Sequence, residues 1–435
     1  MGRHGCSCRR SRPRPRVLLV LAVGPLLVGA VACGRGGGDD DGGGTAETNA
    51  EVDAGRLGPE DPASGEPVRI GLASDGQTAA FDASSEVTAA QATVDYWNER
   101  RGGIGGRPIE LVVCETGADP AGGTDCGNQM VEAGVVAVAV GQSTVAESIW
   151  EPVHQAGIPT MFLQTNGEAI LADAESSFII SNPLTTAFGL PISVAEDQEV
   201  DKVAFVVIDV PVALSLFESV GPQILDNAGL DYELVKVPLG TADMTSQMRE
   251  VVDSGAGVVQ VVGYDAFCIA AFQGLSAFGY DGAVTAVSQC ITDATRQAIP
   301  GDRLQGMYVT SAIALGATDD PTYQQYQAVM DAYGQDVGDV DNNVPMSGYT
   351  VIAALATALG GLSGDITPQS VTEAIKAMPD EPLPGGGGVT FRCGGSAMAT
   401  MPSVCSNQWL RASLDAGGQP AGYEAVDSTD ILEGL

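Results

Sequence analysis

The sequence predicts an α/β fold of two Rossmann-like lobes, and three observations lead to it. Residues 68–113 follow the order strand, loop, helix, strand, which is a βαβ unit and predicts a parallel sheet. The same alternation stops near residue 180 and begins again near residue 203. The chain has 435 residues, more than the ~250–300 that one hydrophobic core usually serves. Such sheets bind ligands in the loops at the carboxyl ends of their strands, so a site is expected there.

The first βαβ unit is recognised from the spacing of its apolar residues. A short apolar run at 68–74 predicts the first strand, and residues 108–113 predict the second. Residues 84–101 predict a helix, because apolar side chains recur at steps of three and four and so share one face. That face consists of Val87, Ala90, Val94 and Trp97. The next helix is expected to open at Asp119-Pro120, a capping residue followed by proline.

The alternation continues through both halves. In the first half we expect strands at 135–140 and 158–162, with a helix at 145–155 between them. Phe178–Ile180 then interrupts the pattern, so four strands are expected in this sheet. The strands expected in the second half are 203–208, 232–237, 258–262, 284–287 and 305–309. The helices expected there are 212–228, 244–252, 267–278, 322–333, 348–359 and 367–378. Residues 389–391 and 408–411 are expected to pair as a hairpin closed by a cysteine pair.

The N-terminus has the features of an export signal. Residues 1–32 combine an arginine-rich head with an apolar run that is shorter than the ~20 residues of a membrane-spanning helix. Ala30-Val-Ala-Cys33 resembles a bacterial lipobox, which implies that Cys33 is the first residue after cleavage and carries a diacylglyceryl group. An ordinary signal-peptidase site with an incidental Cys33 is the alternative. Residues 33–65 are rich in Gly and Asp and are expected to form a flexible tether.

Charge and cysteine content narrow the class of protein. Six of the 20 basic residues lie in the leader, so 14 remain against 55 acidic residues. This acidity argues against binding to nucleic acid, and against binding to anionic lipid by charge.

The six remaining cysteines fall into three locally spaced pairs, and we expect three disulfides. The pairs are Cys114 with Cys126, Cys268 with Cys290, and Cys393 with Cys405. Without a Cys-x-x-Cys, and with His154 as the one histidine beyond the leader, we expect neither metal nor cofactor.

A set of motifs in a fixed order resembles the leucine/isoleucine/valine-binding type of bacterial solute-binding protein. The motifs are Asn98–Val113, Asp119-Pro120, Gly141–Thr144, Ala156–Thr160 and Gly348-Tyr349. The resemblance extends from about residue 66 to 425 and implies the type I periplasmic-binding-protein fold, with two lobes joined by three crossovers. It implies a first lobe of 66–183 with 312–378, a second of 184–311 with 379–425, and a tail of 426–435. It also implies a ligand held between the lobes and delivered to an ABC permease.

Polar residues after the strands are the candidate ligand-binding residues. In the first lobe these are Ser74, Gln77, Gln142, Ser143, Gln164 and Thr165. Hydroxyls, amides and exposed N–H groups suit a carboxylate or an amide, and the resemblance implies that Ser143 grips a ligand carboxylate. Capping of the following helix is the alternative role for Ser143. In the second lobe the candidates are Asp209, Tyr264, Asp265 and Gln289.

One departure from the resembled family concerns amino-acid specificity. Phe267 stands where amino-acid binders tend to have the acidic partner of the ligand's amino group, and Asp265 is expected to substitute for it. The sequence therefore predicts a monomeric, lipid-anchored extracytoplasmic protein that binds a small polar solute, either an amino acid or a related amide or carboxylate. The alternatives are a sensor lipoprotein, or a hydrolase that uses Asp209 with Asp265. Turnover would reveal an enzyme, whereas stoichiometric binding is expected here.

Overall fold

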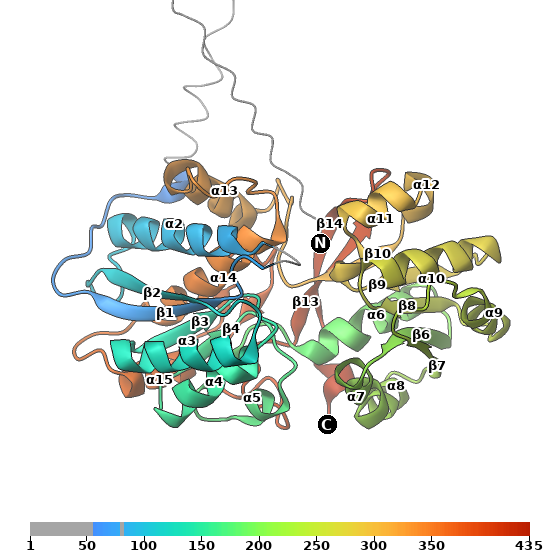
Figure 1. The fold of residues 1–435 in the computed structure, drawn as a ribbon, viewed down its shortest axis with the longest axis horizontal. Coiled ribbons are helices and arrows are strands. Elements are labelled where there is room, and N and C mark those ends of the chain that lie inside the picture. Colours follow the sequence, from blue (N-terminus) through green and yellow to red (C-terminus); the bar gives the residue numbers. More distant parts are fainter. Residues whose placement is uncertain (1–54, 79–81) are drawn as a thin grey trace, which may run out of the picture. The chain divides into compact units, whose positions relative to one another are not determined.

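This computed structural model describes residues 55–78 and 82–435, and two large sheets organise it (Figure 1). The predicted leader at 1–32 and Cys33 lie outside these residues. The predicted tether reaches residue 65, but the structure places Leu57 in a hydrophobic core. The N–H groups of Asp61 and Ala63 donate to carbonyl groups at the end of the helix at 84–100. The last carbonyl groups of a helix have no N–H partner within the helix, so they can accept these hydrogen bonds.

The first sheet is parallel and has the strand order β2-β1-β3-β4-β5. Its strands are β1 (Val68–Ser74), β2 (Ile109–Glu115), β3 (Ala137–Val140), β4 (Thr160–Phe162) and β5 (Ser177–Ile179). The four predicted strands are confirmed. The expectation of four strands in all is wrong, because Phe178 and Ile179, where the predicted alternation stops, belong to β5 beside β4. A three-residue strand is too short to show an alternating pattern.

Helices cover both faces of the first sheet (Figure 1). One face packs against α2 (Ser84–Arg100), α13 (Pro321–Tyr333), α14 (Asn343–Ala358) and α15 (Pro368–Ala377). The other packs against α3 (Pro120–Ala133), α4 (Ala146–Gln155) and α5 (Glu168–Ala172). The strands divide their side chains accordingly: Ile70 and Leu72 lie in the first core and Ala73 in the second. Residues far apart in sequence, on α2 and α14, are thereby brought together.

The second sheet has the order β14-β13-β10-β9-β8-β6-β7. Its parallel strands are β6 (Lys202–Asp209), β7 (Asp231–Pro238), β8 (Val258–Val262), β9 (Ala283–Ala286) and β10 (Tyr308–Ser311). Two antiparallel strands, β13 (Gln408–Leu414) and β14 (Pro420–Asp427), extend it at β10. The predicted hairpin of 389–391 with 408–411 is therefore wrong. β12 (Thr390–Phe391) pairs with β11 (Glu381–Pro382), while β13 satisfies the open edge of β10.

Helices also cover both faces of the second sheet. One face carries α6 (Leu190–Asp197), α7 (Pro211–Ser219) and α8 (Gly221–Asn227), with η1 (Thr185–Gly189) before them and η3 (Asp430–Leu432) at the end of the chain. The other carries α9 (Thr245–Asp253), α10 (Asp265–Ala277), η2 (Ser288–Cys290), α11 (Asp293–Ala298) and α12 (Gly301–Leu304). The helix predicted at 212–228 is two helices, because Pro222 lacks the N–H that a continuous helix needs.

Disulfides and hydrogen bonds link separate segments of the chain. All three predicted disulfides are confirmed. Ile179 of β5 forms a bridge with Val404, and the Asn182 amide donates to Asn407 Oδ1 at 2.9 Å. Residues 379–425 were predicted to belong to the second lobe, but Phe391 lies in the first core. No helix in the described part of the chain is long and apolar enough to cross a membrane.

Candidate ligand-binding site

Asp75 is the centre of the loops at the carboxyl ends of β1, β2 and β3. It follows β1 directly and is 1% exposed. Its carboxylate accepts hydrogen bonds from Thr116 Oγ1 at 2.7 Å, Ser143 Oγ at 3.0 Å, and the N–H and hydroxyl of Thr144 at 2.8 Å each. Asp75 thus binds the loops after β2 and β3 to the end of β1. The sequence did not single it out, although a carboxylate directly after a buried strand is a signal that could have done so.

Glu86 forms a second buried centre beside it, in the first turn of α2. Its carboxylate accepts from Ser74 Oγ at 2.6 Å, the Gln142 N–H at 2.8 Å and Ser347 Oγ at 2.9 Å. Burial raises the pKa of Glu86 to about 7, although these hydrogen bonds oppose the rise. A side chain at Gly141 would place its Cβ 2.0 Å from Glu86 Oε1, so the loop after β3 needs glycine there. Sequence reasoning missed Glu86, because its partners come from three separate parts of the chain.

The structure places two first-lobe candidates within these networks. Ser74 is fully buried, and its hydroxyl donates to Glu86. The Ser143 hydroxyl donates to Asp75 and accepts from the Val145 N–H at 3.1 Å. Both hydroxyls therefore already have protein partners.

The other first-lobe candidates have side chains nearer to solvent. Gln142 is half-buried and Gln164 is exposed. Thr165 is half-buried, and its hydroxyl accepts from the Gly167 N–H at 3.2 Å. Gln77 is exposed, and its amide donates to Asp82 at 2.9 Å. Amide side chains thus follow three of the five strands of this sheet.

The second-lobe candidates also follow the carboxyl ends of strands. Asp209 ends β6 and is exposed, Tyr264 follows β8 with 40% of its surface exposed, and Gln289 is exposed in η2 after β9. Asp265 opens α10, and its side chain is outside what the structure describes. Phe267 is 3% exposed and lies against Gly263, where an added Cβ would come within 2.4 Å of its ring. Phe267 is therefore a core residue.

A buried disulfide holds two of these second-lobe loops together. Cys268, in the first turn of α10, is bonded to Cys290 of η2, and both are fully buried. Tyr264 precedes the first cysteine by four residues and Gln289 precedes the second by one. The loops after β8 and β9 are thereby linked below their exposed side chains.

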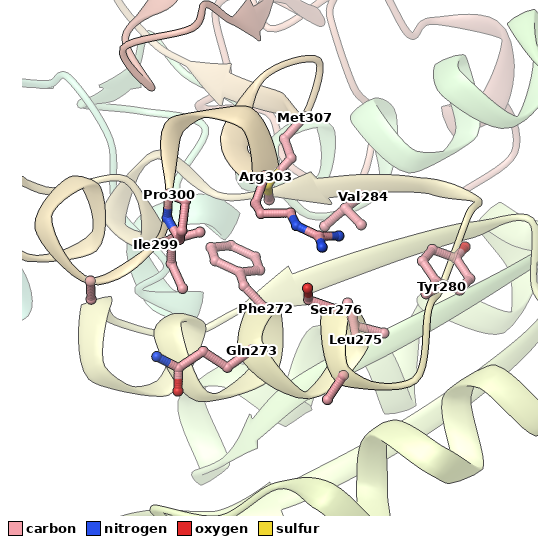
Figure 2. A pocket seen from close by; sticks show the side chains of 12 residues that line it. Phe272, Gln273, Leu275, Ser276, Tyr280, Val284, Ile299, Pro300, Arg303 and Met307 are labelled. Atoms are coloured by element: carbon pink, nitrogen blue, oxygen red, sulfur yellow. The ribbon is translucent and has the colours of Figure 1, made fainter.

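Two cavities lie away from these loops. One of about 410 Å³ is lined by α10, α12 and the start of β9, with Phe272, Ile299 and Arg303 among its lining residues (Figure 2). The other, of about 480 Å³, lies beside α4 and α15. Both are at the amino-terminal ends of the strands, since Val284 lies near the start of β9 and Ser176 precedes β5. Neither contains any of the ten candidate residues.

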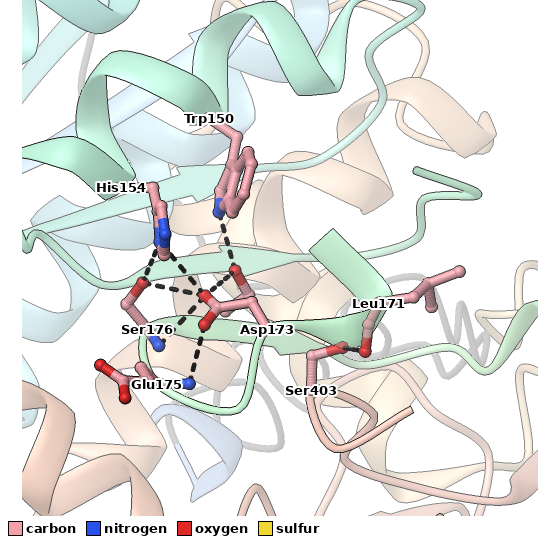
Figure 3. A network of polar contacts seen from close by, with 8 residues as sticks. Trp150, His154, Leu171, Asp173, Glu175, Ser176 and Ser403 are labelled. Carbon is pink, nitrogen blue, oxygen red and sulfur yellow. Dashed lines mark hydrogen bonds and ion pairs between the residues drawn. The ribbon is translucent and has the colours of Figure 1, made fainter. Parts of the chain in front are cut away.

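The second cavity borders a network around His154 that resembles a catalytic triad in composition only (Figure 3). His154 Nδ1 lies 2.9 Å from Ser176 Oγ and 3.4 Å from Asp173 Oδ2. Ser and Asp thus meet the same ring nitrogen, whereas a triad needs them on opposite nitrogens. Over the described residues, no group of His, Cys, Asp and Glu is arranged to hold a metal ion.

Comparison with known proteins identifies similar sequences and folds. The sequence model of a family described as "Periplasmic binding protein" matches residues 67–407. Among curated protein sequences none matches this chain. An ABC transporter substrate-binding protein from Sphaerobacter thermophilus is 19% identical with a TM-score of 0.65, and the match covers 84% of this chain and 100% of that one.

Two other similar structures contain ligands. The branched-chain amino acid transporter substrate-binding protein of Streptococcus pneumoniae, in complex with isoleucine, is 15% identical with a TM-score of 0.62. That match covers 83% of this chain and 99% of the other. A solute-binding protein of R. palustris in complex with 4-hydroxybenzoate is 18% identical with a TM-score of 0.63, over 83% and 97% of the two chains. At these identities the likeness concerns the fold.

Proposed function

Because the chain belongs to the periplasmic binding protein family, we propose that it captures a small polar solute outside the cytoplasm and delivers it to an ABC permease. The family match over residues 67–407 carries this proposal, since it spans the first sheet and the second sheet as far as the start of β13. Members of this family bind solutes for transport and are not enzymes. Solute capture is therefore favoured over hydrolysis by Asp209 and Asp265.

The proposed site lies between the carboxyl ends of the two sheets. Gln77, Gln142, Gln164 and Thr165 supply amides and a hydroxyl from the first lobe, and Ser143 shapes its loop. Asp209, Tyr264, Asp265 and Gln289 supply the second lobe's contacts. A solute that touches both lobes only when they close stabilises the closed state, which is how binding is coupled to a change of conformation.

The proposed location follows from the leader and Cys33. Cleavage before Cys33 and its acylation would anchor a monomer to the outer face of the cell membrane. In cells that express the full chain, Cys33→Ala should release the protein into the soluble extracytoplasmic fraction. Mass spectrometry of the wild-type N-terminal peptide should show a diacylglyceryl group. An unmodified N-terminus beginning at another residue would contradict the anchor but not the solute-binding function.

The first test of solute binding is a thermal-shift screen of residues 34–435. The panel contains amino acids, amides, carboxylates, polyamines and sugars, and includes isoleucine and 4-hydroxybenzoate because similar structures hold them. A solute at 100 times its Kd adds about 2.7 kcal/mol to the free energy of unfolding, which shifts the Tm measurably. Saturable binding at one solute per chain is expected. Conversion of a panel member to product would instead favour an enzyme.

Two exposed tyrosines of the second lobe make a matched pair for locating the site. Tyr264, 40% exposed, follows β8 at the carboxyl edge, and Tyr232, 38% exposed, lies at the start of β7. Tyr264→Ala should weaken solute binding at least tenfold by calorimetry, because an aromatic ring that covers the solute is lost. Tyr232→Ala should leave the Kd unchanged. Equal effects of the two changes would place the site elsewhere.

A further inference from the structure

The loop after β3 has its hydrogen-bond donors engaged by the chain's own acids. The N–H of Gln142 donates to Glu86, and the N–H of Thr144 donates to Asp75, each at 2.8 Å. The hydroxyls of Ser143 and Thr144 both donate to Asp75. These are the donor types that would hold a solute carboxylate at this edge of the sheet. An arriving carboxylate would have to displace Asp75 from them.

The buried carboxylate of Asp75 repels an incoming anion as well. Asp75 and Glu86 are both buried, so little water screens them. Across residues 55–78 and 82–435, no Lys, Arg or His forms an ion pair with either acid. On the second sheet, Lys236 of β7 pairs with Glu218. The candidate residues that remain available to a solute are uncharged amides, a hydroxyl and a phenol, together with further carboxylates.

We propose that Asp75 is a specificity-determining residue that excludes carboxylates from the first-lobe end of the solute site. The solute is then uncharged or cationic at the end that the first lobe holds, for example an amide or an amine. This inference rests on the proposed function, because it concerns the same site. Asp75 acts as a positioning residue, because it accepts hydrogen bonds from Ser143, Thr144 and Thr116 and so occupies their donors. Its own side chain is buried and is not exposed to solvent.

Pairs of solutes that differ only in having a carboxylate or an amide distinguish this role of Asp75 from a purely structural role in holding the loops. The pairs are leucine with leucinamide, isoleucine with isoleucinamide, and 4-hydroxybenzoate with 4-hydroxybenzamide. Calorimetry on residues 34–435 should find the amide of a bound pair at least tenfold tighter in the wild type. Asp75→Asn should shift the ratio of the two Kd values at least tenfold toward the carboxylate. A wild type that binds the carboxylate more tightly, with a ratio that Asp75→Asn leaves unchanged, would overturn the proposal.

Asp173 provides the control. It is a carboxylate of the same lobe that accepts from the Ser176 N–H, the hydroxyls of Ser176 and Ser177, and the Glu175 N–H, but it lies at the amino-terminal ends of the strands. Asp173→Asn should lower the Tm and leave the ratio of carboxylate to amide affinity unchanged. A general effect of losing a hydrogen-bonded carboxylate would move the ratio in both variants, and that result would also overturn the proposal.

A second variant tests the donor set without any knowledge of the solute. Asp75→Ala leaves the Thr116, Ser143 and Thr144 donors without their shared acceptor. Added formate should then produce a saturable rise in the Tm of this variant, absent in the wild type and absent with formamide. If neither protein binds any solute of these pairs, the proposed class of solute is wrong. The formate result then tests independently whether Asp75 excludes carboxylates. An Asp75→Ala protein that formate does not stabilise would contradict a donor set built for a carboxylate.

Discussion

At the scale of single residues, Asp75 and Glu86 account for the local structure of the first-lobe loops. Burial of a carboxylate is unfavourable unless hydrogen bonds replace the lost water. Asp75 has donors from the loops after β2 and β3, and Glu86 has donors from β1, the loop after β3 and α14. Burial raises the pKa of Glu86 to about 7, within the physiological range, and this shift gives a prediction.

Glu86→Gln should change how stability depends on pH. In the unfolded chain Glu86 titrates near its ordinary pKa of 4.5, while in the folded protein it titrates at about 7. The folded state therefore holds the proton more tightly. Protonation of Glu86 therefore stabilises the folded protein by about 3 kcal/mol below pH 4.5. This contribution to the free energy of unfolding is lost as the pH rises through 7. Gln at this position cannot ionise and should not show that loss.

The measurement is urea unfolding of both proteins at pH 5 and pH 8. The difference in unfolding free energy, variant minus wild type, should grow by about 2–3 kcal/mol between the two pH values in favour of the variant. A difference that stays constant with pH would show that Glu86 does not titrate in this range.

At the scale of elements, α14 packs in close contact with α2. It is buried on nearly all sides, as expected for a helix that is apolar all round. Gly348 brings it against the first turn of α2, where an added Cβ would lie 2.2 Å from the Glu86 carbonyl oxygen. The backbone of α2 cannot shift without moving Glu86 and the loop that it holds. Packing of α2 on α14 therefore sets the position of the candidate site.

Gly348→Ala should lower the unfolding free energy by about 3 kcal/mol, because the methyl group forces the two helices apart. Gly361→Ala is the matched control: no atom lies within 4 Å of a Cβ added there, so its effect should stay within about 0.5 kcal/mol. Urea unfolding measures both. Equal stability of the two variants would show that α2 and α14 separate without loss.

The disulfide between α10 and η2 gives a prediction about the second-lobe loops. It closes a separation of 22 residues, so replacing both Cys268 and Cys290 by Ser should cost about 3 kcal/mol. Hydrogen exchange at residues 263–267 and 288–290 should become faster. Replacing Cys114 and Cys126, which join β2 to α3, should destabilise the protein by a similar amount and leave exchange of those second-lobe residues unchanged. Faster exchange in both variants would indicate general loosening.

At the scale of the whole molecule, segments that leave one sheet for the other are fastened together. Asn182 follows β5 and Asn407 precedes β13, and both are buried. Besides their mutual hydrogen bond, Asn182 accepts from the Leu184 N–H and Asn407 donates to the Ala397 carbonyl. The asparagine pair therefore joins the segment that follows β5 to the segment that precedes β13.

Asn182→Ala and Asn407→Ala should each lower the unfolding free energy by about 1–3 kcal/mol, because each leaves a buried amide without its partner. The double variant should lose about 1 kcal/mol less than the two single losses together, since the second change removes an already unpaired group. A double-mutant cycle by urea unfolding measures this coupling. Strict additivity would mean that the two amides do not interact.

The sequence alone predicted the features that are local along the chain. Apolar spacing placed β1 to β4 and the alternating helices, because burial of one face imposes a period that is visible within a few residues. The order of motifs predicted the family, and local spacing predicted all three disulfides. Where signals were short or shared between segments, prediction failed: β5 was missed, and residues 389–391 were paired with the wrong strand.

Only the tertiary structure revealed what the candidate site's polar groups contact. Ser143 was predicted from its position after a strand, but its bond to Asp75 joins residues 68 positions apart. Glu86 meets Ser347 across 261 positions. A hydrogen bond requires two groups at about 3 Å, and no periodicity in the sequence records which distant residue supplies the second group. The sequence therefore determined which loops reach the carboxyl edge, and the packing of α2, α14 and β3 decided that their donors serve the chain's own carboxylates.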